Sequence, residues 1–148
     1  MTYQEELDHI LKTNDGFLRP QDVVDYARSP ETSLHSHFTW DDTEAAEKYR
    51  LDQARAVIRI VVIVTSSDKE PIKAYVSLSS DRKENNGYRA IVQVLNDEVL
   101  TNMLLNDARR ELEIFRTKYE RLKDVSGMQG VFDAIDNLPD IKEAANAS

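Results

Sequence analysis

Apolar residues recur at helical spacing in the first third of the chain. Residues 3–13 predict a short helix that ends at the Asn-Asp-Gly turn of residues 14–16. Pro20 suits the first position of a second helix, which we expect to continue to about Arg28. Ser29-Pro30 predicts a further turn or short helix leading toward Phe38. The apolar stripes of the two helices are Leu7, Ile10 and Leu11, and Val23, Val24 and Ala27.

A third helix is predicted from Asp41 to about residues 54–56. Asp41 followed by Glu44 is typical of a capping box, with Asp as the N-cap residue. The pattern then changes, because every residue from 57 to 64 except Arg59 is β-branched. Such side chains crowd the turns of a helix and fit a pleated sheet. The run therefore predicts a strand with both faces covered.

Two more strands are predicted further along the chain. Residues 72–79 alternate between apolar and polar side chains, as in a strand with one wet face. Asn86-Gly87 indicates a tight turn before a strand at residues 88–95. The connections are too short for parallel crossovers, so we expect a three-stranded antiparallel meander.

The longest predicted element is a helix over residues 97–123, followed by a short helix at residues 131–138 that ends before Pro139. The order of elements predicts one α+β domain over residues 1–148. A helix near 40 Å long, at about 1.5 Å per residue, exceeds what one small sheet can cover. We therefore expect the helical part, residues 97–138, to form a homo-oligomer. The residues assigned to self-association are Leu100, Leu104, Leu112, Phe115 and Tyr119.

Composition narrows the classes of function. The chain has 148 residues, a net charge of −8 and no cysteine, which excludes disulfides and thiol chemistry. The N-terminus resembles no signal peptide, and the longest apolar run falls far short of the roughly 20 residues of a membrane span. A cytoplasmic protein without a membrane partner is expected. The familiar nucleophile, zinc-protease and phosphate-loop motifs do not occur, so we expect no enzyme, no catalytic residue and no cofactor.

His35 and His37, with Asp41 and Asp42 close behind, could suggest a zinc or iron site. The sequence has no third histidine or glutamate at a spacing that is diagnostic of a metal site. A helix cap and a polar turn explain the same residues, so no metal is predicted.

A DNA-binding interpretation has more support. Three helices followed by strands and a charged hairpin resemble the order of a winged-helix domain, with residues 43–56 as recognition helix and 81–87 as wing. Against it, Glu44 and Asp52 share the helix face and the net charge is acidic. The alternative is a solvated helix with local ion pairs. The residues predicted to contact phosphates are Lys48, Arg55, Arg59, Arg82, Lys83 and Arg89.

Two further sets of residues have both a structural and a binding interpretation. Leu34, Phe38, Trp40 and Tyr49 are typical of a core cluster, with a protein-binding hot spot as the alternative. The acidic balance could instead imitate the phosphates of DNA. The acidic residues considered for such mimicry are Asp8, Asp15, Asp22, Asp25, Asp41, Asp42 and Glu44.

The run LRPQDVVDYARSPETSLHSHFTWDDTEAAEKYRLDQARAVIR, residues 18–59, resembles a family of small phage and prophage proteins. Tyr88-Arg89 and residues 115–119 are similar to that family too. The family has no established activity, so the resemblance carries over no catalytic residue and implies a phage-encoded accessory protein near replication or recombination. The chain is thus predicted to be a non-enzymatic accessory protein that self-associates and acts on DNA or on a DNA-handling complex. The alternatives are an acidic inhibitor or DNA mimic of a host defence enzyme, or a virion structural component.

Overall fold

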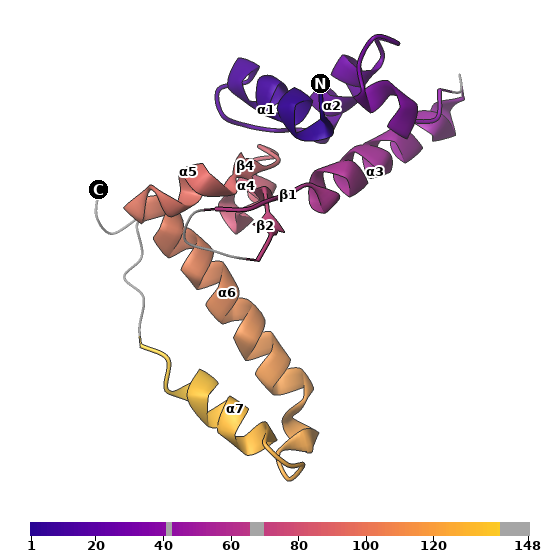
Figure 1. Cartoon of the computed structure of the whole chain (residues 1–148). Coiled ribbons are helices and arrows are strands. Elements are labelled where there is room, and N and C mark those ends of the chain that lie inside the picture. Colours follow the sequence, from indigo (N-terminus) through magenta and orange to yellow (C-terminus); the bar gives the residue numbers. More distant parts are fainter. Residues whose placement is uncertain (41–42, 66–69, 140–148) are drawn as a thin grey trace. The chain divides into compact units, whose positions relative to one another are not determined.

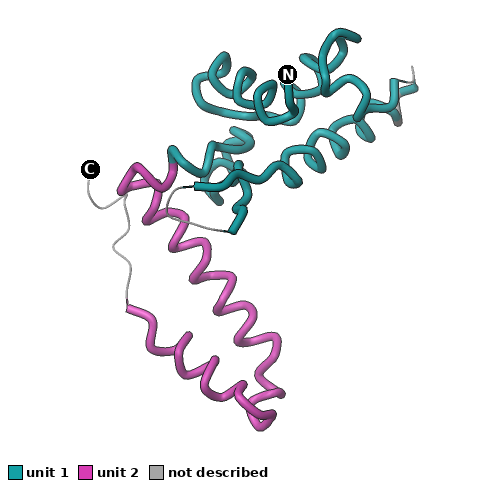
Figure 2. Tube along the Cα trace, viewed as in Figure 1, with its two compact units in different colours: residues 1–93 teal, residues 94–148 magenta. Residues whose placement is uncertain are grey.

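The computed structural model describes residues 1–40, 43–65 and 70–139 of the chain (Figure 1). The chain forms two compact units, unit 1 at Met1–Gln93 and unit 2 at Val94–Ser148 (Figure 2). Helices and short antiparallel strands occur together, which confirms the α+β class. Within these described ranges, no helix combines the length and the apolarity that a membrane span requires.

The first two helices lie where the apolar spacing predicted them. α1 (Tyr3–Thr13) begins with a capping box, in which the Thr2 hydroxyl accepts the Glu5 N–H and the Glu5 carboxylate accepts the Thr2 N–H. α2 (Pro20–Ala27) begins at Pro20, as expected, and ends one residue before the predicted end. The predicted apolar stripes are confirmed, since all six residues are buried: Leu7, Ile10, Leu11, Val23, Val24 and Ala27.

The predicted strand over residues 57–64 is wrong in its first half. α3 (Glu44–Ile60) continues through it, and β1 (Val62–Ile63) is all that remains of the strand. Val57 and Ile58 are fully buried, whereas Ile60 is 63% exposed. This burial pattern is that of a helix and not the alternation of a strand. Packing of α3 against α2 in the core outweighs the weak preference of β-branched residues for strands.

The start of α3 differs from its prediction as well. The proposed cap Asp41 lies outside the described residues, and Thr43 is the N-cap residue, without a side-chain cap hydrogen bond. Before it, the predicted turn toward Phe38 is a single 3-10 turn, η1 (Leu34–His37).

The three-stranded meander is wrong. The described strands form two separate two-stranded antiparallel sheets. β1 pairs with β2 (Ile72–Lys73), and β3 (Tyr75–Val76) pairs with β4 (Arg89–Ala90). Ala74 divides the expected long strand: its N–H donates to Val61 O at 3.0 Å, while its carbonyl accepts the Ile91 N–H at 2.8 Å.

The winged-helix topology is not supported. The segment assigned to a wing begins as α4 (Ser79–Lys83), and the strand predicted for residues 88–95 becomes β4 followed by α5 (Ile91–Leu95). Asp81 is the physical reason for α4, because its carboxylate is buried in the first turn and binds Arg89. A buried carboxylate with an ion-pair partner requires a fixed backbone rather than an open loop.

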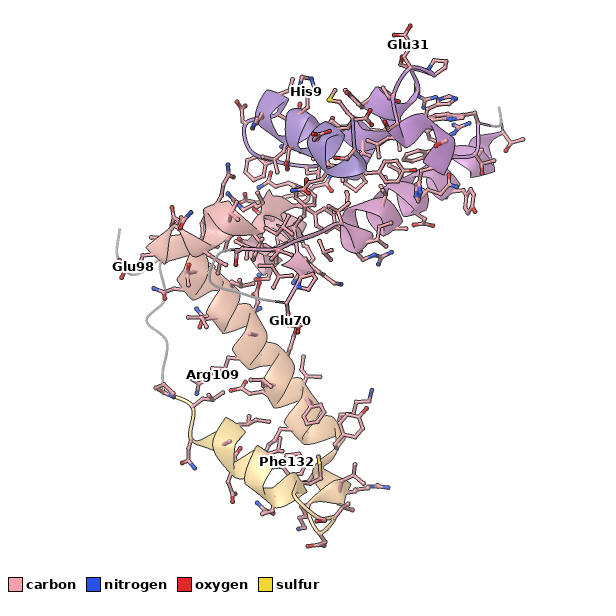
Figure 3. All side chains as sticks on the ribbon, viewed as in Figure 1. His9, Glu31, Glu70, Glu98, Arg109 and Phe132 are labelled. Carbon is pink, nitrogen blue, oxygen red and sulfur yellow. The ribbon has the colours of Figure 1, made fainter. Side chains whose placement is uncertain are left out.

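The described part of unit 2 is built mainly of two helices, which residues 119–127 join. α6 (Glu98–Lys118) begins at Asp97, whose carboxylate accepts the Leu100 N–H at 2.9 Å, and ends before the predicted Lys123. η2 (Glu120–Leu122) follows, and α7 (Met128–Asp136) begins three residues earlier than predicted. Phe132 lies between α6 and α7 and is fully buried (Figure 3).

Candidate functional site

Trp40 is the center of a cluster of stacked rings and cations in unit 1. The His35 ring stacks on it with a centroid separation of 4.9 Å and an interplanar angle of 12°. The guanidinium groups of Arg50 and Arg28 lie 5.2 and 5.7 Å from the ring centroid. The indole N–H donates to His35 O at 2.9 Å. These contacts engage the indole within unit 1, where it packs against the hydrophobic core.

Glu47 connects α3 to the cations around Trp40. Its carboxylate binds Arg50 at 2.7 Å and Arg28 at 3.0 Å, and it accepts from the Gln21 amide at 3.3 Å. The hydrogen bond from Gln21, followed by that from Arg28, lowers the pKa of the Glu47 carboxyl. Glu47 was not among the residues singled out from the sequence, because its partners are up to 26 residues away.

The two histidines considered as metal ligands contact backbone carbonyls. His35 Nδ1 lies 2.8 Å from Ala27 O, and His37 Nε2 lies 3.0 Å from Gln53 O. Asp41 and Asp42 lie outside the described residues. Among the residues that the structure describes, no three His, Asp or Glu side chains converge to hold a metal ion.

The cations predicted to contact DNA lie on three elements. Lys48, Arg55 and Arg59 are exposed on α3, and Arg55 binds Asp52 at 3.0 Å. Arg82 and Lys83 are exposed on α4, where Arg82 donates to Ser77 O. The side chains on α3 and α4 are therefore open to solvent.

Arg89 is held inside the fold. Its guanidinium forms two hydrogen bonds with the Asp81 carboxylate, at 2.8 and 2.9 Å, and lies 4.6 Å from the Phe17 ring centroid. Asp81 is only 1% exposed. Because a buried carboxylate needs a cation, Arg89 stabilizes the fold of α4.

A pocket of about 270 Å³ lies beside one of the α3 cations, Arg55. Arg55 lines it together with Leu51 of the same helix, and Asn85 lines it from the turn after α4. Arg19 and the first residues of α2 complete the wall. The sequence did not indicate that Arg19 and Asn85 approach Arg55, since this proximity depends on the tertiary fold.

The acidic residues considered for DNA mimicry have several different roles. Asp8 accepts from the Tyr75 hydroxyl at 2.6 Å, and burial, with that hydrogen bond, raises the pKa of Tyr75. Asp15 lies in a turn with φ of +58°. Asp22 and Asp25 line a pocket of about 160 Å³ beside His9 and Tyr26.

Four of the apolar residues assigned to self-association lie on α6, and the fifth, Tyr119, is its C-cap residue. No described residue of α6 is buried, although the helix has 21 residues. Leu112 and Phe115 are exposed, whereas Leu100, Leu104 and Tyr119 are partly covered. An apolar hollow of about 250 Å³ lies over α6, and its lining includes Leu105, Leu112 and Leu138.

Comparison of the chain with protein-family models, with curated proteins and with solved structures returned no match. Its function is therefore inferred from the geometry of the molecule.

Proposed function

We propose that the chain is a non-enzymatic accessory protein that self-associates through unit 2 and contacts DNA through unit 1. The observation that carries the proposal is the uncovered apolar surface of α6 and α7. Large apolar patches on a soluble protein are typical of protein interfaces. The apolar side chains of unit 2 that are at least 37% exposed are Leu95, Val99, Leu105, Leu112, Ile114, Phe115, Leu122, Val125 and Val131.

A second copy of the same chain is the partner that fits this surface. Two helices enclose little core, whereas two such hairpins together form the four-helix arrangement in which an apolar stripe is covered on all sides. The middle of α6 carries both acidic and basic side chains, some of which already pair within the helix, such as Arg109 with Glu113; the residues are Asp107, Arg109, Arg110, Glu111 and Glu113. A two-fold axis can therefore place opposite charges against each other around the apolar contact.

The test is the oligomeric state of the full chain. We expect the wild type to sediment as a dimer, with about twice the 17.0 kDa mass of the chain. Leu105→Glu combined with Leu112→Glu puts two charges into the hollow and should give a monomer that keeps its helical circular dichroism. Thr117→Glu introduces one such charge at an exposed position of α6 outside the hollow and should remain dimeric. A monomeric wild type, or a dimer that survives the double substitution, would refute self-association at this face.

DNA contact is supported by the open cations of α3 and α4. Arg55 and Arg59 are four residues apart on one helix and share its face, and Lys83 is exposed on α4. Guanidinium and ammonium groups in such positions bind phosphates without reading base sequence.

Fluorescence anisotropy of a labeled 20-base-pair duplex tests the contact. The affinity of the wild type should fall with salt, with log K decreasing by about 0.9 per phosphate contact for each unit of log salt concentration. Arg59→Gln with Lys83→Gln should weaken binding to any duplex sequence and make the salt dependence shallower. DNA would be excluded as the partner if the duplex affinity of the wild type did not change with salt concentration, or if the wild type bound no duplex at low salt.

A further inference from the structure

The pocket lined by Arg19, Arg55 and Asn85 is built from three segments that are far apart in the sequence. The backbones of Leu18 and Tyr88 exchange hydrogen bonds of 2.8 and 2.9 Å, which hold Arg19 beside the turn that contains Asn85. The packing of α2 against α3 brings Arg55 to the same place. The pocket therefore has a fixed frame, and its polar side chains come from different segments.

The chemistry of the lining is that of a hydrogen-bond donor site. Arg19 and Arg55 each present a guanidinium group, and Asn85 presents a side-chain amide. The Gln21 amide nitrogen already donates to Asp25 and Glu47, so Gln21 contributes to the wall and not to the donors. Among the described residues that line the pocket, none is a carboxylate.

Each arginine has a carboxylate nearby but keeps donors for a ligand. Arg55 binds Asp52 at 3.0 Å and Arg19 lies 3.8 Å from Asp22, and both arginine side chains are more than a third exposed. A guanidinium has five N–H donors, so one carboxylate contact leaves others for an anion. Two guanidinium groups on one small pocket favor a phosphate, whose oxygens accept from both.

The volume of the pocket fits a phosphate group better than a larger ligand. Pockets that enclose a whole small molecule usually have about 300–1,000 Å³, so about 270 Å³ is near the lower limit. The apolar wall at Leu51 and Pro20 suits the sugar that follows a phosphate in a strand. We infer that this pocket binds one phosphate group of a DNA backbone. The inference rests on the proposed DNA contact and specifies where that contact is made.

The experiment replaces both guanidinium groups in the full chain. Arg19→Gln with Arg55→Gln removes the two charges, and circular dichroism checks that the variant folds. Lys12→Gln is the control, because Lys12 is also an exposed cation of unit 1 but lies in the last turn of α1, outside the pocket. The probes are the labeled duplex, followed by anisotropy, and adenosine monophosphate and inorganic phosphate, followed by shifts of the Asn85 side-chain amide in NMR spectra.

We expect the double variant to bind the duplex at least about tenfold more weakly than the wild type, with a salt slope shallower by about 0.9. The control should bind as the wild type does. An unchanged affinity and slope in the double variant would overturn the pocket and leave DNA contact elsewhere on unit 1. If the wild type binds no duplex while the Asn85 amide shifts with free phosphate in the wild type alone, the pocket is a phosphate site and the DNA proposal fails. Absence of both responses would overturn both.

Discussion

At the scale of single residues, Gly87 shows how closely two segments of unit 1 approach. Its φ is +83°, a conformation that side chains rarely adopt, and a Cβ atom there would lie 2.9 Å from Arg19 Cα and closer still to Leu18 O. We expect Gly87→Ala to lower the free energy of unfolding by about 1–3 kcal/mol. Urea denaturation followed by Trp40 fluorescence measures this change.

Gly130 is the matched control for Gly87. It lies within α7, where an added Cβ would meet no atom within 4 Å. Gly130→Ala should leave unit 1 unchanged and stabilize α7 by about 0.5–1 kcal/mol, because alanine loses less backbone entropy than glycine in a helix. Equal effects of the two substitutions would contradict the close approach of Gly87 to Leu18 and Arg19.

Glu47 makes the stability of unit 1 depend on pH. Its pKa in the folded state is lowered from 4.5 by hydrogen bonds with Gln21, Arg28 and Arg50. The unfolded chain therefore binds this proton more readily than the folded chain does. The resulting stabilization is fully present above about pH 4.5 and is lost as the pH falls through the lowered pKa.

Melting temperatures measured between neutral and acid pH test this dependence. Glu47→Gln should lower the melting temperature near pH 7 and reduce the further loss on acidification. Glu31→Gln removes an exposed carboxylate on the turn after α2 and should keep the acid loss of the wild type (Figure 3). Parallel pH profiles for the two variants would rule out the role of Glu47.

At the scale of elements, local patterns predicted the first two helices and failed where distant contacts decide. α1 and α2 have apolar stripes and start signals that agree with each other, so their positions followed from the sequence. Residues 57–60 have side chains typical of a strand, but they continue the burial pattern of α3 at Ala54. The packing of α2 on α3 was not visible in the sequence, and it determines which pattern prevails.

The candidate sites follow the same rule. The exposed cations Lys48 and Arg55 of α3 could be recognized from helical spacing alone, whereas Arg59 lay in the segment predicted as a strand. The pairing of Asp81 with Arg89 and the approach of Arg19 to Asn85 could not, because each depends on chain reversals and on the bridge between Leu18 and Tyr88. Sequence patterns thus identified charged side chains and left their partners unknown.

Ile58 and Ile60 distinguish the helix from the predicted strand by experiment. In a strand both side chains would lie on one face. In α3, Ile58 is fully buried and Ile60 is 63% exposed. Ile58→Ala should cost about 2–5 kcal/mol of unfolding free energy, and Ile60→Ala about 0.5 kcal/mol or less. Similar costs at both positions would indicate a strand.

At the scale of the whole molecule, the two units differ in how much core they have. Unit 1 contains a continuous cluster of buried side chains that joins α1, α2 and α3 to the strands. Within the described part of unit 2, α6 has no buried residue and α7 contributes Phe132 and Ile135. Arg116 adds a contact between the helices through Asp136 at 2.9 Å, but an ion pair that is partly open to solvent adds little stability. Unit 2 should therefore depend on association for its stability, and unit 1 should not.

This difference predicts two unfolding transitions with different dependence on protein concentration. Trp40, the single tryptophan, reports on unit 1, whereas circular dichroism at helical wavelengths also follows α6 and α7. Over about a hundredfold range of concentration, the helical transition should move to higher temperature as the dimer forms, because association stabilizes the folded state by mass action. The Trp40 transition should stay in place. In Leu105→Glu with Leu112→Glu, both transitions should become independent of concentration, with that of unit 2 at the lower temperature. If the Trp40 transition moved together with the helical one, unit 1 would take part in the association. If the helical transition of the wild type did not depend on concentration, self-association would be contradicted.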